Sequence, residues 1–334
     1  AFAGCESLAS VNIQGGFTEI GYGAFADCRG LASVAIPVGV TKIGRDVFAR
    51  CWSLASVTIP DTVTKIGDHA FAGCVNLASV TIPDSVARIE SHAFAECRLL
   101  ASVAIPGSVT RVGDHAFADC HSLASLTIGD GVTEIGYGAF ACCRRLTSVA
   151  VPESVTRIGR YAFIDCKRLA SVAIPGGATK IGDHAFTNCG KLSSLTIGDG
   201  VTEIRSRAFA GCRRLTSVNI PESVTVIGES AFADCKRLAS LAIPGGATKI
   251  AKNAFAGCQA LSSVSISNGA LMLWTSPFAL ATSFTETPVL AAMMDGYQQL
   301  RREGGTRALG LSLSVDRAPA GGVRRWIRRQ RRSD

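Results

Sequence analysis

Apolar positions recur along this chain with a fixed period of 23 residues. Phenylalanine, cysteine and leucine each fill one column of the repeat, as Phe71, Cys74 and Leu77 do in one unit. The cysteine column holds twelve of the 13 cysteines: Cys5, Cys28, Cys51, Cys74, Cys97, Cys120, Cys143, Cys166, Cys189, Cys212, Cys235 and Cys258. Such a period predicts a solenoid, because each unit is too short to bury its own apolar face and must stack on its neighbours.

Within one unit, the order of polar and apolar residues predicts a strand, a turn and a compact bend. Residues 56–59, SVTI, alternate, so the valine and isoleucine face the core while the serine and threonine face away. Pro60 ends this strand because proline cannot donate a hydrogen bond to a β-ladder. Val63 and Ile66 supply a second apolar pair, and residues 70–74, AFAGC, fit one helical turn that points its phenylalanine and cysteine inward.

Stacking these units at the strand spacing of about 4.8 Å gives a parallel solenoid of about twelve coils, roughly 55 Å long. The strands then form a parallel sheet along the solenoid, and the phenylalanine and cysteine columns become rows in its core. The expected fold class is therefore a repeat β-solenoid with a parallel sheet and short helical turns.

The repeat pattern L-x-x-V-x-I-P-x-x-V-x-x-I-G-x-x-A-F-x-x-C occurs at Leu54–Cys74 and again at Leu100–Cys120. It resembles the BspA-like leucine-rich repeat family of bacterial and protist proteins, and the resemblance covers nearly all of residues 1–267. This resemblance implies a right-handed leucine-rich-repeat solenoid, commonly surface-exposed or secreted, that serves adhesion and the binding of proteins or matrix. It supplies no shared catalytic residues that could be transferred to this chain.

Two regions are expected along the chain. Residues 1–267 form the solenoid, and because the chain starts in the middle of a repeat, we expect a fragment or a processed form. Residues 268–334 form a C-terminal cap, with one amphipathic helix capped by Thr287 and a basic, flexible tail. Such a helix could cover the open end of the solenoid, as repeat arrays require.

The formal net charge of +8 is uneven along the chain. The last 66 residues hold ten Lys and Arg against five Asp and Glu. No apolar run approaches the ~20 residues that a transmembrane helix needs, and the longest candidate, residues 270–281, is interrupted by Pro277. We therefore expect no transmembrane segment.

The cysteine and histidine columns raise the question of metal or redox chemistry. Cysteines of adjacent coils come within reach of each other, but side chains in parallel register point the same way and do not suit the disulfide dihedral near 90°. No zinc-binding spacing occurs, so we expect buried free thiols, with Cys142 as the odd, more exposed one. His69, His92, His115 and His184 share one column, whose other members include glycine, tyrosine and arginine; this variety favours a solvated turn over a metal site.

The outward side of the strand carries a ladder of small hydroxyls, typified by Ser56, Thr58 and Ser102. Such an array could bind an ordered surface such as ice or a polysaccharide, but alanines such as Ala104 and Ala150 interrupt it, as expected of a crowded sheet. No nucleophile elbow or Gly-rich phosphate loop occurs in the sequence, and the histidines lie on another face than the serines. We therefore expect no enzyme, no cofactor, no bound metal and no small-molecule substrate.

The most specific candidate for function is a basic seam, which we define as the cationic residues in the two positions after the cysteine column. In five successive coils it comprises Arg144, Arg145, Lys167, Arg168, Lys191, Arg213, Arg214, Lys236 and Arg237. The fold would align them in a double row of roughly 20 Å, which attracts polyanions such as sulfated glycans, acidic protein surfaces, anionic lipid or nucleic acid. The alternative is an ordinary solvated edge, partly neutralised by Asp165 and Asp234 and enlarged by a tandem duplication, since residues 129–196 recur at 198–265.

The sequence thus predicts a non-enzymatic repeat protein that binds a macromolecule, either a protein or an acidic glycan or other polyanion. Its expected place, at a cell surface or outside the cell, rests on the family resemblance. The alternative is an intracellular scaffold, cytoplasmic or nuclear, whose RRWIRRQRR tail acts as a nuclear address or a nucleic-acid anchor. Nucleic acid is a candidate partner only through this tail.

Overall fold

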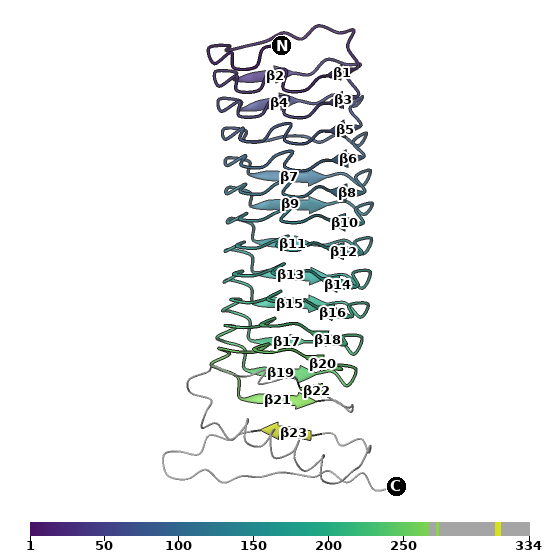
Figure 1. The fold of residues 1–334 in the computed structure, drawn as a ribbon, viewed down its shortest axis with the longest axis vertical. Helices are drawn as coiled ribbons and strands as arrows, with labels where there is room; N and C mark the ends of the chain where they lie inside the picture. The colour runs from purple at the N-terminus through teal and green to yellow at the C-terminus, as the bar shows by residue number, and fades with distance from the viewer. Residues whose placement is uncertain (267–271, 274–310, 315–334) are drawn as a thin grey trace.

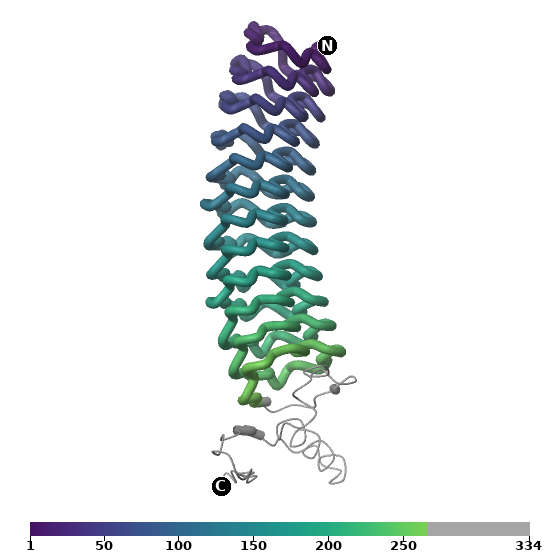
Figure 2. Tube along the Cα trace, turned by 90° about the vertical axis from the view of Figure 1, so that its left-hand side faces the viewer, coloured from purple at the N-terminus to yellow at the C-terminus, as the bar shows by residue number. Residues whose placement is uncertain are grey.

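A computed structural model describes residues 1–266, 272–273 and 311–314 (Figure 1). These residues form a parallel-strand solenoid of about 11 turns. The predicted number was twelve, and the difference arises because residues 1–266 hold fewer than twelve complete periods. Figure 2 shows the same molecule from the side as an elongated column, in which successive coils follow one another along the long axis. The predicted C-terminal helix and basic tail lie outside the described residues.

One sheet runs the whole length of the column and consists of short strands, one per coil. Its members are β1 (Glu19–Ile20), β3 (Lys42–Ile43), β5 (Lys65–Ile66), β6 (Arg88–Ile89), β8 (Arg111–Val112), β10 (Glu134–Ile135), β12 (Arg157–Ile158), β14 (Lys180–Ile181), β16 (Glu203–Ile204), β18 (Val226–Ile227), β20 (Lys249–Ile250) and β22 (Met272–Leu273). Each pairs in parallel with the strand one period later, for example Ile43 with Ile66. In the members of this sheet from β1 to β16 and in β20 the isoleucine or valine thus lies in the core, while its charged neighbour faces solvent.

The longer strands lie on a second side of each coil and fall into four short sheets. They are β2 (Ser33–Ala35) with β4 (Ser56–Thr58); β7 (Ser102–Ile105) with β9 (Ser125–Ile128); β11 (Ser148–Ala150) with β13 (Ser171–Ile174) and β15 (Ser194–Ile197); and β17 (Ser217–Asn219) with β19 (Ser240–Ile243), β21 (Ser263–Ile266) and β23 (Leu311–Ser314). All pairs are parallel except β21 with β23, which is antiparallel. The predicted outward sheet is therefore present, but as segments.

Proline or glycine after the strand decides how far each of these ladders extends. The backbone N–H of Gly129 donates to the carbonyl of Ile105 at 2.9 Å, and that of Gly198 donates to Ile174 at 2.9 Å. Both bonds extend the pairing to four residues. Where the next coil has Pro60 instead, no donor is available and the β2–β4 ladder stops after three residues.

The predicted helical turn at AFAGC is wrong, because two residues in every coil have left-handed backbone conformations. His69 and Gly73 have φ values of 55° and 74°, and their equivalents in other coils are alike. The backbone N–H groups of His69, Phe71 and Gly73 donate to carbonyls of the following coil at 2.8–2.9 Å instead of to a preceding helical turn. Within the described residues these segments are successive tight turns, and no helix is present.

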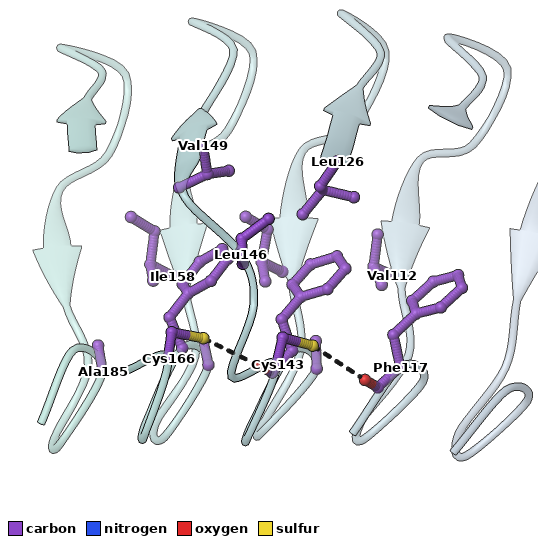
Figure 3. Close-up of a cluster of buried hydrophobic side chains, with 14 of the residues drawn as sticks. Val112, Phe117, Leu126, Cys143, Leu146, Val149, Ile158, Cys166 and Ala185 are labelled. Carbon is purple, nitrogen blue, oxygen red and sulfur yellow. Dashed lines mark hydrogen bonds between the residues drawn. The ribbon is translucent and has the colours of Figure 1, made fainter. Parts of the chain in front are cut away.

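The core consists of the predicted columns. Phenylalanine rings of adjacent coils are stacked with centroids 5.1–5.5 Å apart, from Phe2 to Phe255. Each column thiol from Cys28 onward donates to the carbonyl of the phenylalanine 26 residues earlier, as Cys143 does to Phe117 at 3.3 Å (Figure 3). All 13 cysteines are free, and of the column only Cys5 is exposed. The predicted buried free thiols are confirmed, and burial raises the pKa of the Cys51 thiol to about 12, so it stays a neutral donor.

Candidate functional site

The basic seam occupies the corner that follows each buried cysteine. In one coil, Cys143 and Leu146 are fully buried and the N–H of Leu146 donates to the Cys143 carbonyl at 3.1 Å. This hydrogen bond closes a tight turn, and the side chains of its two middle residues, Arg144 and Arg145, extend into solvent. The same bond recurs between Leu169 and Cys166, at 3.0 Å. All nine seam residues are exposed.

None of the nine seam cations forms an ion pair with another described residue. The two carboxylates predicted to neutralise the seam are not paired with it. Asp165 accepts a hydrogen bond from the amide of Asn188 at 3.2 Å, and Asp234 makes no ion pair within the described residues. The seam is therefore a row of positive charge over five coils without carboxylate partners. Because the coils pair in parallel and in register, the row follows the long axis of the solenoid.

The cations of the short-strand sheet have a different environment. Lys65 pairs with Glu90 at 2.9 Å, and Lys180 pairs with Glu203 at 2.7 Å, in each case one coil apart. The hydrogen bond from Lys180 holds the pKa of the Glu203 carboxyl below its ordinary value, with a further contribution from Arg205. Cations of this sheet thus have carboxylate partners, Glu90, Glu134 and Glu203, which the seam cations lack among the described residues.

In the coils before Arg144, the same two positions carry a different surface. Arg29 pairs with Glu6 at 3.1 Å and lies over the ring of Trp52 at 4.2 Å. Arg98 pairs with Glu96 at 3.3 Å, and Leu99 exposes half of its side-chain surface. The same two positions therefore change from aromatic, apolar and charge-paired residues in the early coils to cations at nine of the ten positions between Arg144 and Arg237.

The histidine column forms a stacked ladder, which was not predicted from the sequence. The ring centroids of His69 and His92 lie 4.5 Å apart, and those of His92 and His115 lie 4.8 Å apart. Beyond His115 the ladder continues through Tyr137, which makes edge-to-face contacts with His115 and Tyr161 at 4.9 and 5.3 Å, and then through Tyr161, which stacks on His184 at 4.7 Å. Residues one period apart share a column and meet across the coil spacing, so His69, His92 and His115 carried a signal in the sequence; Tyr137 did not, because it lies one position before the column, which holds Gly138 in that coil.

Two imidazole nitrogens in this ladder, Nδ1 of His69 and Nδ1 of His92, are buried without a hydrogen-bond partner. Burial lowers the pKa of His92, and the neighbouring His69 and His115 lower it further. Among the described residues, no group of three or more His, Cys, Asp or Glu side chains is placed to hold a metal ion. The ladder is thus a half-buried packing feature of the turns rather than the solvated turn that the sequence predicted.

The hydroxyl face lies on the longer strands, with Ser56, Thr58 and Ser102 exposed as predicted. Its ladder is not continuous, since β9 does not pair with β11 and β15 does not pair with β17. The hydroxyl face therefore consists of several short ladders and does not offer an ordered surface one continuous array.

Comparison with known proteins identifies the family of the chain. The model of the BspA-type leucine-rich repeat region, present in six copies, matches residues 1–101, 87–216 and 179–289. The chain belongs to the BspA-type leucine-rich repeat family. Members of this family are generally non-enzymatic scaffolds, and leucine-rich repeats generally mediate protein binding. No curated protein matches the chain.

Solved structures of other leucine-rich repeat proteins are similar to this one. A leucine-rich repeat protein of Bacteroides ovatus is 29% identical with a TM-score of 0.53, over 80% of this chain and 82% of that one. A leucine-rich cell surface protein of Faecalibacterium prausnitzii is 32% identical with a TM-score of 0.42, over 77% and 86% of the two chains. In the part of the chain that the structure describes, no helix has the length and apolarity needed to cross a bilayer.

Proposed function

We propose that this BspA-type repeat protein binds an acidic macromolecule through the basic seam, without catalysing a reaction, at a cell surface or outside the cell. The observation that carries the proposal is the row of nine exposed cations with no carboxylate partner among the described residues. The extracellular location rests on family membership.

The form of the seam favours a linear polyanion, in particular a sulfated or carboxylated glycan. The double row is straight over five coils and roughly 20 Å long at the strand spacing of ~4.8 Å. Proteins that bind single-stranded nucleic acid interleave cations with aromatic stacking platforms, and no aromatic residue occupies the seam positions between Arg144 and Arg237. A polymer that carries charge but no bases therefore fits this surface best.

Heparin affinity chromatography tests the proposal. Reversing Arg144, Arg145, Arg213 and Arg214 to glutamate removes the two Arg-Arg pairs. We expect this variant to elute at much lower salt, because each lost contact between a cation and a sulfate group removes part of the salt-dependent binding free energy. The matched control reverses Lys42, Arg88, Arg207 and Lys252, which are exposed cations outside the seam, and so applies the same change in net charge.

The control protein should elute close to the parent protein if the seam is the site. Equal retention of the parent and seam variants would refute the proposal, and an equal loss in both variants would show that only net charge matters. Binding of a poly-aspartate peptide by the parent but not by the seam variant, with no retention of the parent on heparin, would assign the seam to an acidic protein instead.

A further inference from the structure

A cavity of about 510 Å³ lies near the N-terminal end of the column, where Trp52, Val75 and Arg98 follow three successive column cysteines. This volume falls within the ~300–1,000 Å³ typical of small-molecule sites. Gly73 lies in one column between Arg50 and Glu96 of the adjacent coils, and all three residues line the cavity. The turn alanines Ala49 and Ala72 line it as well.

Trp52 presents an aromatic surface to this cavity. Its side chain is 43% exposed, and the guanidinium of Arg29 covers one face of the ring at 4.2 Å. Arg29 belongs to the preceding coil and does not line the cavity, whereas Val75 of the following coil lines it together with Trp52. An aromatic face of this kind packs against apolar C–H surfaces of a ligand.

The carboxylate and guanidinium groups that line the cavity have partners of opposite charge, some of them outside its lining: Asp46, for example, pairs with Arg45 at 3.1 Å. Arg50 donates two hydrogen bonds to Asp27 at 2.7 and 2.6 Å, and Arg98 pairs with Glu96 at 3.3 Å. Since both guanidinium groups already have carboxylate partners, the cavity does not require an anionic ligand. Their remaining N–H groups and the carboxylate oxygens of Glu96 can still donate to and accept from hydroxyl groups.

From this arrangement we infer that the cavity binds a neutral saccharide, with one sugar ring against Trp52 and its hydroxyls on Arg50, Arg98 and Glu96. A pyranose has an apolar C–H face and a polar rim of hydroxyls that both donate and accept, which matches an indole beside charge-compensated polar groups. The inference is independent of the basic seam, which lies in later coils and lacks carboxylate partners.

Isothermal titration calorimetry with neutral tetrasaccharides, namely cellotetraose, mannotetraose, xylotetraose and chitotetraose, tests the inference. We expect at least one of them to bind the parent protein. The variant Gly73→Asn should lower that affinity at least about tenfold, because a side chain fills the gap between Arg50 and Glu96 and a factor of ten corresponds to about 1.4 kcal/mol. Asparagine is tolerated in this column, since Asn188 occupies it with a φ of 61°.

Gly4→Asn is the matched control, because Gly4 shares the column with a φ of 76° and has open space where a side chain would extend. It should bind the saccharide like the parent protein, and both variants should keep the parent's heparin retention. Absence of binding for all four saccharides, or binding that Gly73→Asn leaves unchanged, would overturn the inference. Neither result would bear on the seam, whose charge-reversal variant should bind the neutral saccharide normally.

Discussion

At the scale of single residues, the solenoid depends on identical side chains that meet across the coil spacing. Phe117 is fully buried, and its ring stacks on Phe94 at 5.2 Å and on Phe140 at 5.5 Å. Its carbonyl also accepts the thiol hydrogen of Cys143. Removing one such ring therefore affects three coils, because both neighbours lose a packing surface.

The variant Phe117→Ala should be destabilised by about 3–5 kcal/mol, because it loses buried apolar surface and leaves a cavity. Thermal or urea unfolding monitored by circular dichroism measures the change. Phe17→Ala is the control, since Phe17 is 58% exposed and lies outside the phenylalanine column. A Phe117→Ala protein as stable as the parent would show that the column is not what holds the coils together.

The residue columns were also the part of the structure that the sequence predicted best. A position that is apolar in every repeat can only face the core that all repeats share, so the inward side chains such as Phe71 and Cys74 followed from the period alone. The seam residues were likewise placed at one exposed corner. Their ligand was not predictable, because exposed cations have the same sequence signal whether they bind a partner or water.

At the scale of elements, the turns differ from the prediction. The sequence AFAGC has good helix formers, yet His69 and Gly73 adopt left-handed conformations that end any helix. The signal was present in the two columns, which are rich in Gly, Asp, Asn and His, the residue types that tolerate positive φ. A single repeat does not reveal this preference for positive φ, because the histidine and alanine of one turn are also compatible with a helix.

The aromatic ladder built on these turns predicts a dependence of stability on pH. The pKa of His92 is lower in the folded protein than its ordinary value of 6.5, mainly because of burial. The unfolded chain therefore binds protons first on acidification, so stability is complete above about pH 6.5 and falls as the pH decreases below it. Melting temperatures measured between pH 7.5 and 5.5 should decline for the parent protein.

The variant His92→Asn should show a weaker decline over this range, since it cannot be protonated. Asparagine suits the position because Asn253 occupies the same column with a φ of 58°. His121→Asn serves as the control, because His121 lies outside the ladder and bonds to Asp119. Identical pH profiles for the parent and His92→Asn would contradict the prediction.

At the scale of the whole molecule, the coils are arranged in groups of three. The four-residue pairings β7–β9, β13–β15 and β19–β21 recur every 69 residues, as shown by Ile105, Ile174 and Ile243. This spacing equals the offset of the tandem duplication in the sequence. The segmentation of the longer-strand sheet thus follows the duplicated unit, while the short-strand sheet runs through it unbroken.

Deleting residues 131–199 should therefore give a folded protein three coils shorter. The deletion joins Asp130 to Gly200 and restores the sequence GDGVTEI, so every column stays in register. Circular dichroism should show a cooperative transition and an unchanged signal per residue, and heparin elution should shift to lower salt because five seam cations are lost. Deleting residues 131–188 instead shifts the register and should prevent folding; equal behaviour of the two deletions would contradict the modular arrangement.

The hydrogen-bonded thiol column has a consequence for the conditions under which the protein can exist. From Cys28 to Cys258 every column thiol is buried, and its hydrogen is donated to a phenylalanine carbonyl. Burial raises the pKa of the Cys51 and Cys212 thiols to about 12, and a protonated thiol is a poor nucleophile toward oxidants. The described coils are therefore held together by this hydrogen-bonded column and the packed core, without a disulfide that a reducing agent could break.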